Sequence, residues 1–72
     1  MDGIKVFSEG KSNNAKTFVN LCDIIDENTD PVLKTKSMGK YLKCKSVYDR
    51  QSGRSVFSGT WTRDQIIDAL LK

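Results

Sequence analysis

The clearest pattern along the chain is the alternation of apolar and polar residues in two neighbouring runs, 41–49 and 54–61. A four-residue turn, 50–53, separates them and ends in a glycine, which suits a positive φ. If Asp49 faces Arg54, the bulky apolar side chains gather on one side, whereas a slip by one residue would mix charge among them. The pattern therefore predicts an antiparallel hairpin, 41–49/54–61, with one face turned to the core.

A second pattern, at helical spacing, follows this hairpin. Thr62 and Gln65 match the capping box that starts a helix, and Trp61 and Ile66 match the hydrophobic staple around it. The apolar residues beyond the cap form one stripe, which must be buried. We predict a C-terminal helix over 63–71 that packs on the core face of the sheet.

The first third of the chain is ambiguous. Alternation over 4–8 predicts a short strand. Apolar residues in 14–27 recur at helical spacing after a polar loop, but Val19, Leu21 and Ile25 also fit one face of a strand. We predict a helix near 14–27 and keep a strand in this segment as the open alternative.

The run Asn28-Thr29-Asp30-Pro31 favours a turn, and the residue before a proline is pushed out of the helical region. The run should therefore end whichever element precedes it. After it we expect a short strand over 32–36 and a connecting loop over 35–40.

Together these elements predict a small α+β domain. It contains an antiparallel sheet of three to four strands, packed by the C-terminal helix and by the helix near 14–27. A chain of 72 residues has room for one hydrophobic core, so we expect a single domain over 1–72. No apolar run is long enough to span a membrane, and the N-terminus lacks the features of a secretory signal, so we expect an intracellular, cytoplasmic protein without membrane contact.

Charge changes this picture because it is distributed unevenly. The net charge of +3 arises from an acidic part, 1–31, with a net charge of −3, a basic part, 32–63, with +7, and a final part, 64–72, with −1. A basic excess of this size within 32 residues is more than solubility requires. It points to a polyanionic or acidic partner that binds the hairpin region.

The composition lacks residue types on which most catalytic sites depend. The chain has no histidine, so a Ser or Cys nucleophile would lack its usual base and the common zinc ligand sets are incomplete. Gly10-Lys11-Ser12 resembles the end of a phosphate-binding loop, but position 5 holds Lys5 where that motif needs glycine. We expect a protein that is not an enzyme and has no catalytic residue, metal or cofactor.

The two cysteines, Cys22 and Cys44, lie 22 residues apart in the sequence and form no Cys-x-x-Cys motif. They can pair, but in a reducing compartment we expect both to be free thiols that pack as small buried apolar residues.

Binding chemistry is concentrated in the basic hairpin. Lysine and arginine there can contact phosphates, serine and threonine can donate hydrogen bonds, and an exposed tyrosine can stack on a base. The candidate binding residues are Lys43, Lys45, Arg54, Tyr41, Ser58, Thr60, Lys40, Arg50 and Lys36.

Two functions fit these residues. The first is a small nucleic-acid-binding module or accessory regulator that places its basic hairpin on DNA or RNA. The second is a protein-interaction module, such as a small inhibitor or adaptor, that docks on an acidic partner surface or adds a strand to a sheet edge. A homodimer would be compatible with either function.

Overall fold

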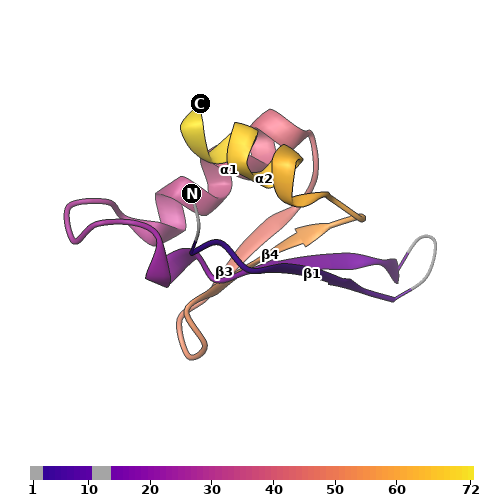
Figure 1. Cartoon of the computed structure of the whole chain (residues 1–72), viewed down its shortest axis with the longest axis horizontal. Helices are drawn as coiled ribbons and strands as arrows, with labels where there is room; N and C mark the ends of the chain where they lie inside the picture. The colour runs from indigo at the N-terminus through magenta and orange to yellow at the C-terminus, as the bar shows by residue number, and fades with distance from the viewer. Residues whose placement is uncertain (1–2, 11–13) are drawn as a thin grey trace.

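In a computed structural model, which describes residues 3–10 and 14–72, the chain forms one antiparallel sheet and two helices on one side of it (Figure 1). The elements in chain order are β1 (Val6–Glu9), β2 (Lys16–Val19), the 3-10 helix η2 (Leu21–Asp23), α1 (Pro31–Leu42), β3 (Ser46–Asp49), β4 (Arg54–Ser58) and α2 (Arg63–Leu71). The four strands lie in the order β1-β2-β4-β3. This arrangement confirms the predicted α+β class. Lys11 and Ser12 of the rejected phosphate-loop motif lie outside the described residues.

The predicted hairpin is present with the predicted register. Asp49 pairs with Arg54 and Ser46 with Phe57, so Ser55 and Phe57 are buried as expected for the core face. Both strands are shorter than predicted. β3 begins only at Ser46 because Tyr41 belongs to the last turn of α1, and β4 ends at Ser58, before Gly59 with its φ of 98°. The helix ends where Lys43 adopts a left-handed conformation, with φ of 59°, and its N–H donates to carbonyls of the last turn.

The predicted helix near 14–27 is wrong, and the strand alternative holds for its first part. β2 lies inside the sheet, antiparallel to both β1 and β4. Thr17 and Val19 are fully buried on the helix-covered side, and Phe18 points to the opposite side. This alternation is what a central strand requires, and pairing on two sides outweighs the local helical spacing.

α1 occupies the segment predicted as a strand over 32–36 and a loop over 35–40, and both predictions are wrong. Asp30 is the N-cap, its carboxylate accepting from the N–H groups of Val32 and Leu33, and Pro31 is the first helical residue. Proline suits this position because the N–H it lacks has no partner within a helix. Asp30 and Pro31, which were predicted to form a turn, therefore start a helix.

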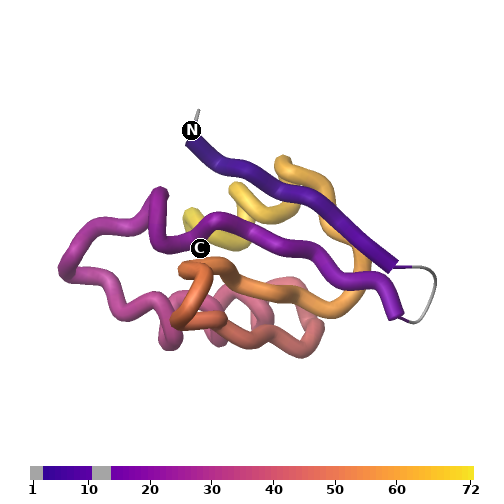
Figure 2. The backbone as a smooth tube through the Cα atoms, turned by 90° about the horizontal axis from the view of Figure 1, so that it is seen from below, coloured from indigo at the N-terminus to yellow at the C-terminus, as the bar shows by residue number. Residues whose placement is uncertain are grey.

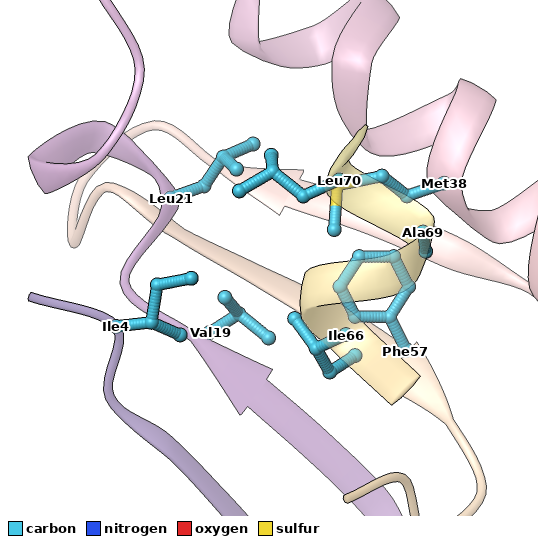
Figure 3. Packing of buried hydrophobic residues seen from close by; sticks show 8 residues of the cluster. All are labelled: Ile4, Val19, Leu21, Met38, Phe57, Ile66, Ala69 and Leu70. Carbon is cyan, nitrogen blue, oxygen red and sulfur yellow. The ribbon is translucent and has the colours of Figure 1, made fainter. Parts of the chain in front are cut away.

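α2 confirms the predicted C-terminal helix, including its capping box: Thr62 Oγ1 accepts from Gln65 N–H, and Thr62 N–H donates to Gln65 Oε1. Its buried face joins side chains from the sheet and from α1 in one core (Figure 3). The buried apolar residues of this cluster are Ile4, Val19, Leu21, Met38, Phe57, Ile66, Ala69 and Leu70. The core thus lies between the sheet and the helices.

Candidate functional site

The nine predicted binding residues are separated by the fold. Those on α1 or at its C-cap are Lys36, Lys40, Tyr41 and Lys43. Those on or beside the hairpin strands are Lys45, Arg54 and Ser58, while Arg50 lies in the hairpin turn and Thr60 in the loop before α2. The helices cover one side of the sheet (Figure 1), so the residues on α1 and those on the hairpin strands lie on surfaces that face away from each other, while Arg50 and Thr60 belong to neither surface.

The first surface, here the helix surface, is the solvent-exposed side of α1. Lys36 and Lys40 lie one turn apart and are exposed, with Ser37 between them. Their spacing places them on the same side of the helix. Leu33, which is 64% exposed, and Tyr41 complete this surface. α1 contains a third lysine, Lys34, and no acidic residue, so the helix adds positive charge alone.

Tyr41 does not lie on the sheet, where stacking on a base was predicted. Its hydroxyl donates to Asp68 Oδ2 of α2 at 2.5 Å, and Lys72 Nζ lies 6.0 Å from its ring centroid. The hydrogen bond to Asp68 is the main cause that raises the pKa of Tyr41 above its ordinary value. Tyr41 therefore links α1 to α2 by a hydrogen bond and lies at the edge of the helix surface.

The second surface, here the open face, is the side of the sheet that no described segment covers (Figure 2). Strand pairing arranges its outward side chains in three rows that run across the four strands in the order β1, β2, β4, β3. The middle row is Phe7, Phe18, Val56 and Val47. The hydrogen bonds between Lys5 and Asn20 and between Ser58 and Lys45 extend the pairing by one residue on either side of the middle row. The flanking row on one side is Lys5, Asn20, Arg54 and Asp49. The flanking row on the other side is Glu9, Lys16, Ser58 and Lys45.

The middle row is an apolar stripe that crosses the whole sheet. Phe7 and Phe18 stack with their ring centroids 4.9 Å apart, and the Arg54 guanidinium carbon lies 5.9 Å from the Phe7 centroid. Phe7 is 48% exposed and Val47 is 66% exposed. Phe18 and Val56 between them are half-buried, so the stripe is most exposed at its two ends.

Sequence reasoning missed this stripe. It placed Phe18 in a helix and paired only the hairpin strands, so it did not bring Phe7 and Phe18 beside Val56. The available signal was the Thr17-Phe18-Val19 run, in which β-branched and aromatic residues favour a strand. A strand there would have turned Phe18 away from its two buried neighbours.

One end of the open face is hollowed into a pocket of about 290 Å³. Its lining includes Lys5, Asn20 and Arg54 and the exposed thiol of Cys22. Desolvation, and then the neighbouring Asp23, raises the pKa of Cys22, so this thiol stays protonated at neutral pH and is a poor nucleophile.

The two cysteines are free in the described structure, and Cys44 is half-buried. Desolvation raises the pKa of Cys44 as well. The expectation that both cysteines are buried holds only in part, because Cys22 is exposed.

Within residues 3–10 and 14–72, no group of three or more Cys, Asp or Glu side chains is arranged to hold a metal ion. In the same part of the chain, neither helix has the length and apolar character needed to cross a membrane.

No protein-family model matches the chain, and no curated protein matches it.

Proposed function

We propose that the protein is a small nucleic-acid-binding module that contacts phosphates through the helix surface. The observation that carries this proposal is the pair Lys36 and Lys40, exposed on one side of a helix without acidic residues and continued by the exposed Lys43 at its C-cap. Lysine side chains at this spacing can neutralise neighbouring phosphates and release their counterions. The proposal moves the contact from the predicted hairpin face to α1.

The chemistry of the helix surface favours a nucleic acid over an acidic protein. Lysine is depleted from the cores of protein–protein interfaces, which prefer aromatic, methionine and arginine side chains. The helix surface offers lysines and one serine hydroxyl, and its larger apolar groups, Leu33 and Tyr41, lie beside them. A helix of 12 residues with one free side also has the dimensions that the major groove of a duplex admits.

Salt-dependent binding tests this function. Affinity for a labelled duplex and for a single strand is measured between about 50 and 200 mM salt, where each phosphate contact on a duplex contributes about 0.9 to the log–log slope. Lys36→Ala and Lys40→Ala should each weaken binding to all sequences alike and reduce the slope by about one. Lys16→Ala, the same charge change on the open face, is the matched control and should leave the slope unchanged.

Two results would contradict the proposal. One is the absence of binding to either nucleic acid at about 50 mM salt, where electrostatic affinity is strong. The other is an equal loss in Lys16→Ala and Lys40→Ala, which would report net charge instead of a defined surface. Recovery of one stoichiometric acidic protein that persists after nuclease treatment would favour the protein-interaction function.

A further inference from the structure

The open face carries a charge pattern at its four corners. Lys5 and Asp49 lie at the two ends of one flanking row, and Glu9 and Lys45 lie at the two ends of the other. The sign of the charge therefore alternates around the corners. Between these rows lies the apolar stripe, so the open face has the apolar centre and polar rim that are typical of a protein interface.

This pattern makes the open face complementary to itself. Two copies can be placed with their open faces in contact and related by a two-fold axis that lies in the plane of contact and runs parallel to the strands. In this arrangement β1 of one copy lies over β3 of the other. β2 then lies over β4. The stripe meets the stripe, and each corner meets a corner of opposite sign.

We propose that two copies of this chain associate through their open faces about this axis, as a four-layer dimer with the helices outside. Lys5 then faces Asp49 of the second copy, and Glu9 faces its Lys45. By symmetry each contact forms twice, as in any isologous interface. The remaining cations of the open face meet neutral residues: Arg54 lies over Asn20, and Lys16 over Ser58.

Packing of the stripe supports the choice of axis. With the axis along the strands, Phe7 lies over Val47 of the second copy and Phe18 over its Val56, so a large side chain meets a small one at every position. A two-fold axis perpendicular to the strands would also pair opposite charges, but it would place ring on ring and valine on valine. The strands of two aligned, packed sheets cross at about −30°, which displaces the paired corner residues from each other. The long Lys and Glu side chains can span this displacement.

The dimer should be weak. The strands are about 4.8 Å apart, so four strands and three rows of side chains cover only a few hundred Å² on each copy. An interface at the low end of the size range gives a weak, concentration-dependent association, with a dissociation constant in the micromolar range or above. The helix surface stays on the outside, so nucleic-acid binding and dimerisation can be tested separately.

Charge reversal with mixing tests this inference by sedimentation velocity. Glu9→Lys alone and Lys45→Glu alone each place like charges at two contacts of the homodimer and should weaken it at least tenfold. An equimolar mixture of the two variants restores opposite charges at both contacts of the heterodimer and should recover dimerisation. Recovery requires both variants to be folded, so misfolding cannot imitate it.

The controls apply the same charge changes away from the open face. Glu27→Lys and Lys72→Glu should dimerise like the parent chain, separately and mixed. Lys40→Ala should also keep the parent dimer while losing affinity for nucleic acid, so failure of one proposal is distinguishable from failure of the other.

Three outcomes would overturn the inference. The first is a parent chain that stays monomeric at about 1 mM, a concentration at which even a weak specific dimer should be populated. The second is a mixture of Glu9→Lys and Lys45→Glu that sediments like either variant alone. The third is recovery when Glu9→Lys is mixed with Lys5→Glu instead, which would establish the perpendicular axis.

Discussion

At the scale of single residues, Thr17 shows how a polar side chain is accommodated in the core. It is fully buried, and its hydroxyl donates to the Gly59 carbonyl at 2.8 Å and accepts from the Trp61 N–H at 2.9 Å. The Ser8 hydroxyl lies 3.0 Å away and can donate to the remaining lone pair. Thr17 therefore holds the loop between β4 and α2 against the middle of the sheet.

Replacement of Thr17 by valine tests this role. Thr17→Val keeps the shape of the side chain but leaves the Trp61 N–H and the Gly59 carbonyl without this partner, which should lower the free energy of unfolding by about 1–3 kcal/mol. Thr17→Ser retains the hydroxyl and should cost less. Urea denaturation measures both variants, and a Thr17→Val chain as stable as the parent would contradict this role.

Tyr41 gives the molecule a pH-dependent contact between its helices. Because the bond to Asp68 raises the pKa of the phenol in the folded state, its contribution to stability is present below the unfolded pKa of about 10 and is lost as pH rises through the higher folded value. Asp68→Asn should move the Tyr41 pKa back toward its ordinary value. An NMR titration of the Tyr41 Cζ resonance measures both values, and an unchanged pKa in Asp68→Asn would exclude this cause.

At the scale of elements, the packing of α1 on β3 depends on Gly39. Gly39 is buried, and a Cβ at this position would overlap the Ser46 hydroxyl and lie 2.6 Å from Ser46 Cβ. The helix can approach the strand this closely because glycine has no side chain.

This approach predicts an unusual response to alanine. In an exposed helix Gly→Ala adds stability, but Gly39→Ala should lower the free energy of unfolding by about 1–3 kcal/mol because it overpacks the contact. Adding Ser46→Gly removes both overlapping atoms and should recover part of the loss. A double-mutant cycle measured by thermal unfolding gives this coupling, and additive effects of the two substitutions would contradict the overlap.

The elements that could be predicted from sequence are those whose signals are local. α2 has a complete capping box, and the hairpin register follows from its own side-chain alternation. α1 was missed because Asp30 and Pro31 suit a turn as well as the start of a helix. The helical spacing in 14–27 was misleading because long-range pairing on both sides decides the structure of β2.

At the scale of the whole molecule, the sequence revealed that charge is segregated but could not reveal how it is distributed in space. The basic part of the chain, 32–63, divides between the helix surface and the strands behind it. Lys43 and Lys45 are only two residues apart, yet Lys43 ends α1 and Lys45 lies on the open face. The apolar stripe of the open face was equally hidden, since it combines residues from all four strands.

The position of β2 inside the sheet also determines the order in which the protein can fold during synthesis. One edge of β2 can pair with β1 once both have emerged, but its other edge pairs with β4, about 40 residues later. A two-stranded hairpin alone is marginally stable in water. Until β4 is synthesised, the hairpin of β1 and β2 therefore keeps one edge of β2 unpaired and leaves Phe7 and Phe18 exposed.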